Sequence, residues 1–296
     1  MILQALKEYY DRKASDPESN IAPEGWEWKE IPFLIVLDHD GELIQIEDTR
    51  EMVGKKKRGK SFLVPQAVKR ASGIAANLLW DVAGYIFGTD KKGTEKKEAF
   101  ISRLQCELSG IPTVHAVIHF LQHVTLERLN QESSWQEIMD TNPNLSFRIG
   151  SSPSLLCRSE EVVSRIDQMI NMDIDAKRGI CLITGKDVAI KRLHTAIKGI
   201  YGAQSMGANI VSFNLDAFQS YGKSQGYNSP VGTEAEFSYT TAINTLLGKD
   251  SNQRLLIGDA TTVFWSAKDS SFEYDFAFFF KEPEKDDPGA GTQKIK

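Results

Sequence analysis

The sequence is poor in cysteine and has no long apolar run. Its three cysteines, Cys106, Cys157 and Cys181, are too few and too far apart for a disulfide framework or a cysteine-based zinc site, and they favour the reducing cytoplasm. No apolar run approaches the roughly 20 residues that cross a bilayer. Residues 1–8 also lack the basic and apolar regions of a signal peptide. These absences predict a cytoplasmic protein.

The chain has no excess of positive charge, because 35 Lys and Arg oppose 40 Asp and Glu and the formal net charge is −5. The bases are nevertheless concentrated. Residues 54–80 contain seven bases and no acid, residues 177–198 contain six Lys and Arg with Asp187 as the only acid, and residues 16–51 contain eleven acids and two bases. Because the field near a patch matters more than the net sum, such a protein can still bind polyanions.

The first basic segment supplies candidates for contacts with DNA phosphates. Gly54 and Gly59 bracket its lysine run and let the backbone adapt to a ligand. The alternative is a loop whose charges are merely solvated, which is common for such runs. Since no acid lies within residues 54–80, we expect local ion pairing not to account for these bases. The candidate DNA-binding residues are Lys55, Lys56, Lys57, Arg58, Lys60, Lys69 and Arg70.

The most distinctive segment is residues 220–230, which combines glycine, tyrosine and serine with Lys, Gln and Asn. Such a loop can approach a ligand closely, stack an aromatic ring and offer amide groups to base edges or phosphates. Composition alone would favour a mobile surface loop. Its candidate DNA-binding residues are Lys223, Ser224, Gln225 and Asn228. A second basic surface, for a nucleic-acid backbone, would be formed by Lys191, Arg192, His194 and Lys198.

Motifs for hydrolysis are incomplete. Residues 222–224 resemble the end of a P-loop, but Ala217 stands where its first glycine is required. The His39-Asp40 pair has too few ligands to hold a metal and lies at an expected turn. A metal-dependent nuclease that uses this pair, or the histidines described next, is the enzymatic alternative.

Three histidines, His115, His119 and His123, recur every four residues on one expected helix. The first two have the spacing of the H-E-x-x-H motif, but Ala116 replaces the glutamate that serves as general base. Histidines beside an apolar stripe are usually packing residues. We therefore expect no enzymatic activity, no catalytic residue, no bound metal and no cofactor.

Periodicity predicts an α+β fold of irregular mixed sheets with helices, without regular βαβ alternation. Two β-rich runs around an Asp-Gly turn predict a hairpin over 31–47. Helices are expected at 2–13, 96–108, 114–129, 159–172 and 234–247. Strands are expected at 61–65, 145–149, 179–184, 208–213, 254–258 and 261–265, and residues 78–87 fit a strand or a buried helix. The expected regions are a hairpin-containing part with the basic loop (1–90), a helical part (91–150), a mixed part (151–281) and a linker-like tail (282–296).

Several segments carry a family resemblance: residues 1–11, residues 21–25 with 30–32, residues 60–66, and the stretch 211–242 that contains Ser220-Tyr221-Gly222-Lys223. In these segments the chain resembles the N-terminal part of the large subunit of the type I-C CRISPR surveillance complex (Cascade). The similarity extends along essentially the whole chain, and its last stretch is highly specific. Family members are longer, so the resemblance implies that this chain is without their C-terminal helical bundle.

The resemblance implies a non-enzymatic recognition role. The large subunit reads the protospacer-adjacent motif in duplex DNA, helps to open the duplex and helps to recruit the helicase–nuclease, while base pairing reads the rest of the target. The implied partners are double-stranded DNA, the CRISPR RNA through the assembled complex, the backbone and handle-binding subunits, the helicase–nuclease and, as inhibitors, phage anti-CRISPR proteins. The structural alternative is an assembly adaptor that binds proteins through residues 16–51 and touches no nucleic acid.

Overall fold

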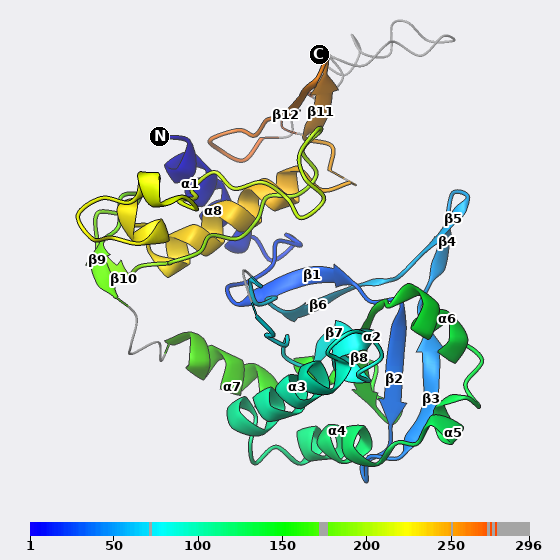
Figure 1. Cartoon of the computed structure of the whole chain (residues 1–296). Coiled ribbons are helices and arrows are strands. Elements are labelled where there is room, and N and C mark those ends of the chain that lie inside the picture. Colours follow the sequence, from blue (N-terminus) through cyan, green and yellow to red (C-terminus); the bar gives the residue numbers. More distant parts are fainter. Residues whose placement is uncertain (71–72, 172–176, 250, 271–272, 274–275, 277–296) are drawn as a thin grey trace, which may run out of the picture. The chain divides into compact units, whose positions relative to one another are not determined.

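The computed structural model describes residues 1–70, 73–171, 177–249, 251–270, 273 and 276. The chain divides into two units (Figure 1), a terminal unit formed by Met1–Glu24 with Ile174–Lys296 and a central unit formed by Gly25–Asp173. The expected tail at 282–296 lies outside the described residues, and the composition-based division into four regions stays a prediction. Within the described residues, no helix combines the length and the apolar character needed to cross a bilayer.

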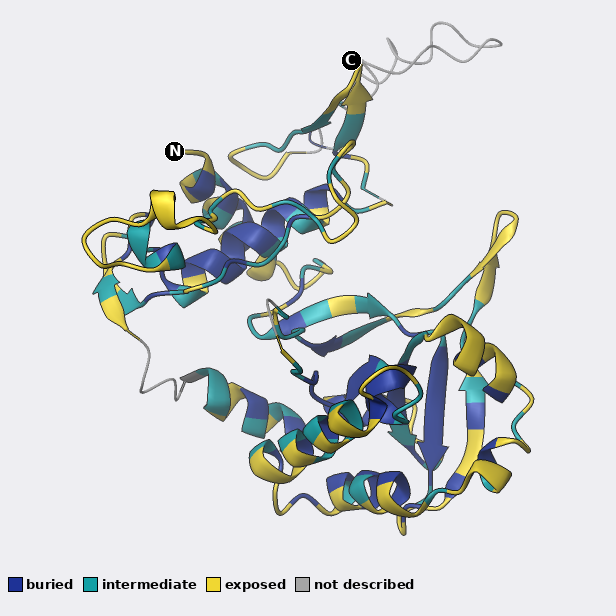
Figure 2. Ribbon diagram, in the orientation of Figure 1, coloured by how far each residue is buried: buried dark blue, intermediate teal, exposed yellow. Residues whose placement is uncertain are grey.

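The central unit is built on a four-stranded mixed sheet in the order β3-β2-β8-β7. β2 (Phe33–Leu37) pairs antiparallel with β3 (Leu43–Asp48) and parallel with β8 (Asn144–Ile149), which pairs antiparallel with β7 (Trp80–Val82). Every residue of β2 is buried, which explains why its sequence is a continuous apolar run (Figure 2). The expected hairpin over 31–47 is therefore confirmed.

Helices pack beside this sheet and connect β7, at the edge of the sheet, to β8, in its middle. α3 (Gly93–Glu107) contacts α2 (Ala83–Ile86) and α4 (Pro112–His123), and α4 contacts β2. The remaining elements of the central unit are α5 (Leu126–Leu129), α6 (Trp135–Thr141), η1 (Leu156–Arg158) and α7 (Glu160–Asn171). Large aromatic side chains fill the core, and they include Trp26, Phe33, Trp80, Phe100 and Phe147.

Two antiparallel ribbons complete the central unit. β1 (Trp26–Glu30) pairs with β6 (Ser61–Pro65) beside the core. Between them the chain forms β4 (Glu51–Val53) and β5 (Lys56–Arg58), which pair as a hairpin that projects from the rest of this unit (Figure 1).

In the terminal unit, α1 (Ile2–Ala14) packs against α8 (Thr233–Leu246). The rings of Tyr10 and Phe237 meet edge to face, with centroids 5.6 Å apart. Two small hairpins flank this pair, β9 (Arg178–Ile180) with β10 (Asp187–Ala189) and β11 (Arg254–Ile257) with β12 (Ala260–Val263). The long connection from 190 to 232 is mostly irregular and contains the short 3-10 helices η2 (Asp216–Phe218) and η3 (Gln225–Asn228).

Polar side chains of α8 hold this irregular connection in place. The backbone N–H of Thr195 donates to Oε1 of the buried Glu236 at 2.5 Å. Asn244 accepts from the backbone N–H of Lys198 at 2.9 Å and donates to the carbonyl of Ala196 at 3.1 Å. The backbone groups of Thr195, Ala196 and Lys198 therefore form hydrogen bonds with side chains of α8 rather than with another strand.

The α+β fold class is confirmed, whereas one expected strand is shorter than predicted and another is wrong. The strand expected at 179–184 ends at Ile180, because Cys181 starts a tight turn in which Gly185 N–H donates to the Cys181 carbonyl at 2.8 Å. At 208–213, Ala208 forms a single bridge with Ile197 and no strand follows. Residues 78–87, expected to form either a strand or a buried helix, contain both, because the strand β7 is followed directly by the helix α2.

Candidate nucleic-acid interface

The lysine run of the central unit is part of the β4–β5 hairpin rather than the loop expected from the sequence. Met52 lies opposite Lys57 and Val53 opposite Lys56, and residues 54–55 make the turn. Gly54 has φ 63° at the first central position of this turn, where a type II′ turn requires a positive φ. The run is therefore displayed on a two-stranded ribbon.

The ribbon presents its lysines to solvent. Lys55, Lys56 and Lys57 are all exposed. Successive side chains of a strand point to opposite faces, so Lys56 and Lys57 extend from different sides of the ribbon, while Lys55 lies in its turn. Positive charge is thus available on both faces.

Ion pairs fix the base of the ribbon. Arg58 Nη2 lies 2.5 Å from Glu30 Oε1. Arg50 pairs with Asp48 at 2.7 Å and with Glu137. Hydrogen bonds from Arg50 lower the pKa of both carboxyl groups, and the nearby charge of Lys57 adds a smaller effect in the same direction. The ribbon is therefore held at its base while its tip extends into solvent.

Two candidate bases of this segment are paired with acids of the fold. Besides Arg58, the guanidinium of Arg70 pairs with the buried Asp81 at 2.5 Å, donates to the Ala75 carbonyl at 2.6 Å and lies 4.0 Å from the ring centroid of Tyr85. Acids outside residues 54–80 thus partner two of the seven bases, which corrects the expectation drawn from that window. Lys60 and Lys69 are exposed.

The loop at 220–230 begins with an unusual turn. Lys223 N–H donates to the Ser220 carbonyl at 2.9 Å. The two residues between them, Tyr221 and Gly222, have φ of 51° and 68°, as the two central residues of a type I′ turn do. A tyrosine therefore occupies a position that glycine, asparagine or aspartate usually fills.

Asn228 holds this loop together. Its Oδ1 accepts from the backbone N–H of Ser220 at 2.9 Å, and its Nδ2 donates to the carbonyls of Lys223 and Gln225 at 2.9 and 3.0 Å. The amide expected to meet a base edge thus serves the loop's own geometry. The base-edge role of the neighbouring Gln225 stays a prediction.

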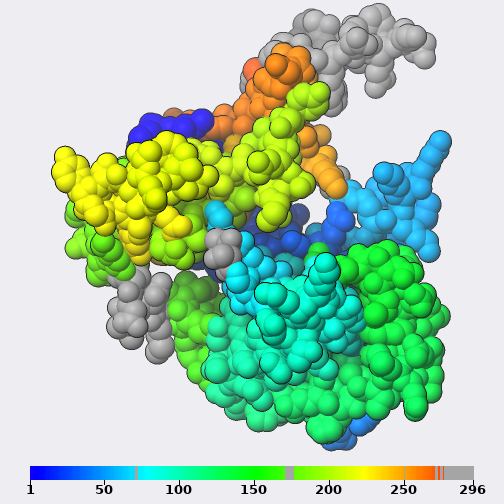
Figure 3. All heavy atoms as spheres, viewed as in Figure 1, coloured from blue at the N-terminus to red at the C-terminus, as the bar shows by residue number. Residues whose placement is uncertain are grey.

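The structure brings the loop and the second basic segment together. Gly226 N–H donates to the Arg192 carbonyl at 3.0 Å, and a Cβ at Gly226 would lie 2.6 Å from the carbonyl oxygens of Lys191 and Arg192. The side chain of Arg192 also donates to Gln225 Oε1. Because only glycine permits this approach, the two segments form one surface, which we call the loop surface (residues 191–192 and 220–228), shown partly in yellow in Figure 3.

The other members of the second basic segment are placed differently. His194 is only 2% exposed, and its Nδ1 lies 2.6 Å from the hydroxyl of Tyr239, so it does not belong to a surface. Burial raises the pKa of Tyr239, and the charge of Glu236 adds to this effect. Lys198 is exposed. Lys177, which its position in the sequence does not mark as a site residue, lies 4.9 Å from the ring centroid of Tyr227 in the loop.

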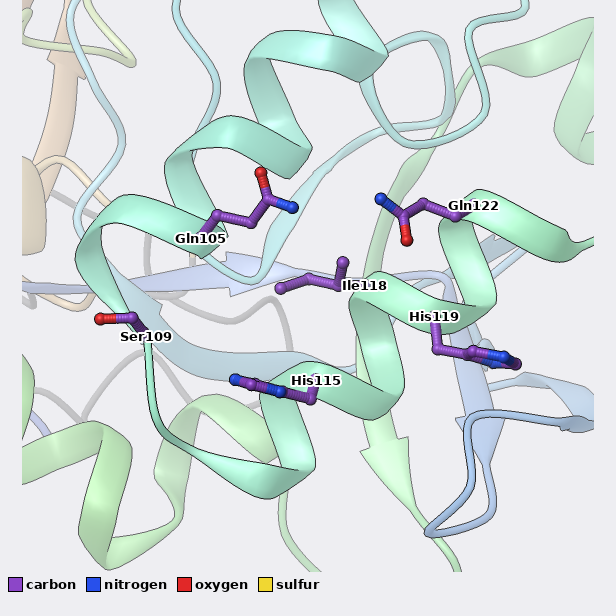
Figure 4. Close-up of a pocket in the computed structure, with 6 residues that line it drawn as sticks. All are labelled: Gln105, Ser109, His115, Ile118, His119 and Gln122. Carbon is purple, nitrogen blue, oxygen red and sulfur yellow. The ribbon is translucent and has the colours of Figure 1, made fainter.

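A shallow pocket of about 500 Å³ lies between α3 and α4 (Figure 4), and its lining residues are Gln105, Ser109, His115, Ile118, His119 and Gln122. The rings of His115 and His119 point in opposite directions in Figure 4, and the ring of His119 stacks on His123 with centroids 4.3 Å apart. In the part of the chain that the structure describes, no three His, Cys, Asp or Glu side chains are grouped so as to hold a metal ion.

Comparison with known proteins identifies a family. The family model described as CRISPR-associated protein (Cas_Csd1) matches residues 6–296, nearly the whole chain. Among curated proteins, none matches the chain.

Proposed function

The chain belongs to the CRISPR-associated Cas_Csd1 family, and from this premise we propose that it is the large subunit of a type I-C surveillance complex that recognises the protospacer-adjacent motif in duplex DNA. Membership itself associates the chain with CRISPR antiviral defence. In the proposal the protein acts in the cytoplasm without enzymatic activity. It helps to open the duplex and to recruit the helicase–nuclease, and base pairing with the CRISPR RNA reads the remaining target.

The observation that carries the proposal is the projecting β4–β5 ribbon with its exposed lysines. The major groove of B-DNA admits a two-stranded β-ribbon, and lysines on both faces of a ribbon can reach the phosphates of both strands. Phosphate contacts position a protein on DNA but carry no sequence information. Recognition of the bases of the adjacent motif therefore requires a second element.

We assign that reading to the loop surface. Gln225 presents an amide at its edge, oriented by the hydrogen bond from Arg192. Amide and guanidinium groups are the side chains that pair bidentately with adenine and guanine edges. Lys223 and Ser224 are exposed beside them and would contact the backbone.

The proposed lack of catalysis rests on the incomplete motifs of the sequence, and the diverging rings of His115 and His119 support it. Stoichiometric metal in the purified protein, with DNA cleavage lost in His119→Ala, would establish the nuclease instead.

The decisive experiment measures binding of the assembled complex to duplexes that differ only in the adjacent motif. Gln225→Ala should weaken binding of the correct motif more than of a wrong one, by about 1–3 kcal/mol. Gln219→Ala, an exposed glutamine of the preceding segment, is the matched control and should leave both affinities unchanged. Equal losses on both duplexes would reduce Gln225 to a backbone contact, and a wild-type complex that binds neither duplex would favour the assembly adaptor.

A further inference from the structure

Tyr221 has a position that packing does not explain. The residue is 97% exposed, so the ring stabilises little of the fold. Its φ of 51° is uncommon for a residue with a Cβ and rarer still for a bulky one. Backbone conformations of this kind persist where the surroundings impose them, and they cluster at ligand-binding sites.

The surroundings of Tyr221 do impose this conformation. Asn228 binds the backbone on both sides of the turn, at Ser220 N–H and at the Lys223 carbonyl. None of these bonds involves the tyrosine ring. The turn is therefore organised before any ligand arrives, and it holds an aromatic ring out in solvent.

The charged residues nearest to the tyrosine in the loop are basic. Residues 217–233 contain no acid, Lys223 follows two positions after the tyrosine, and Arg192 reaches the loop through Gln225. An exposed ring next to cations suits a polyanion that also offers a flat π-face. In a nucleic acid that face is free only on an unpaired base, since the bases of an intact duplex already stack on one another.

We propose that Tyr221 stacks on an unpaired base of a single strand whose backbone is held by Lys223 and Arg192. This inference rests on the proposed function insofar as both assign nucleic acid to the loop surface. It differs in the ligand, which is an unpaired DNA or RNA strand rather than a closed duplex. Stacking accepts every base, so the contact adds affinity for an open strand without reading its sequence.

The test uses the full 296-residue chain and 12-nucleotide single strands of DNA and of RNA, with affinity read by fluorescence anisotropy at low salt. Tyr221→Phe should bind like the wild type because it keeps the π-face. Tyr221→Ala should weaken binding about 5- to 150-fold, the range found for removal of one stacking partner. An abasic strand keeps the phosphates but loses the bases, so wild type and Tyr221→Ala should bind it alike.

Tyr221→Asn separates stacking from the shape of the turn. Asparagine tolerates a positive φ better than tyrosine, so this variant should unfold at the same or a higher temperature than the wild type while binding the single strand as weakly as Tyr221→Ala. Tyr201→Ala removes another exposed tyrosine of the same unit, 62% exposed, and should leave binding unchanged.

Each outcome bears on the inference. Wild-type affinity in Tyr221→Ala, full binding by Tyr221→Asn, or no single-strand binding by the wild type would overturn it. A preference for the DNA or the RNA strand identifies the source of the base. Recognition of the adjacent motif is measured separately on duplexes with Gln225→Ala, so either claim can fail while the other holds.

Discussion

Replacing Lys55, Lys56 and Lys57 by alanine should flatten the salt dependence of DNA binding by the assembled complex. Each phosphate that a protein neutralises releases counterions, and log affinity then falls with log salt by about 0.9 per phosphate. The three lysines are exposed on the β4–β5 ribbon, so the substitutions remove charge without removing core packing. Correct and wrong motifs should be weakened alike, because phosphates carry no sequence information.

The geometry of the ribbon sets the size of this effect. Lys56 and Lys57 point to opposite faces, so a ribbon lying flat on one backbone engages Lys55 and one of the other two, and the slope falls by about 1.8. A ribbon inside a groove engages all three, and the slope falls by about 2.7. Over a fourfold rise in salt, these two differences in slope change the ratio of wild-type to variant affinity by roughly 12-fold and 40-fold.

The assay is a filter-binding titration at several salt concentrations, with thermal unfolding measured in parallel. The matched control replaces three exposed lysines to which no role is assigned, Lys91, Lys92 and Lys249. Neither variant should lower the unfolding temperature appreciably, because exposed charges contribute little to stability. A wild-type slope in the ribbon variant would refute the reasoning and leave the lysines as solvated charges.

Three further predictions concern stability. Glu273→Ala should lower the free energy of unfolding of the terminal unit in urea by about 3 kcal/mol, because the fully buried carboxylate of Glu273 pairs with Arg12 at 3.1 Å. The control Asp269→Ala removes an 83% exposed partner of the same arginine and should cost under about 0.5 kcal/mol. Arg50→Gln should cost about 0.5–1 kcal/mol at pH 7. Arg50 lowers the pKa of Glu137 from 4.5, so the stability that this ion pair contributes is present above pH 4.5 and is lost as the pH falls through the lowered pKa. Urea titrations of the variant and the wild type should therefore converge in acid. Asn228→Ala should expose the 220–228 loop to limited proteolysis with little change in the unfolding temperature, and unchanged protection would show that its three hydrogen bonds do not hold the loop.

Short-range signals in the sequence determined much of the local structure. The hairpin over 31–47 and the helices α1 and α8 follow from turn chemistry and apolar periodicity, which act between near neighbours and persist in most surroundings. The concentration of bases in two segments is also a property of the sequence alone. So is the resemblance to a CRISPR-associated family, which the family match confirms at that level.

Only the tertiary structure decided which candidate residues share a surface. Arg192 meets Gln225 across 33 positions because Gly226 lets two backbones touch, and His194 is buried because Tyr239, 45 positions away, lies against it. Arg70, a candidate for contact with DNA, is paired instead with the buried Asp81. Spacing along the chain predicts contacts within one turn or strand, whereas these contacts depend on how helices and irregular segments pack, and packing is settled by the whole core at once.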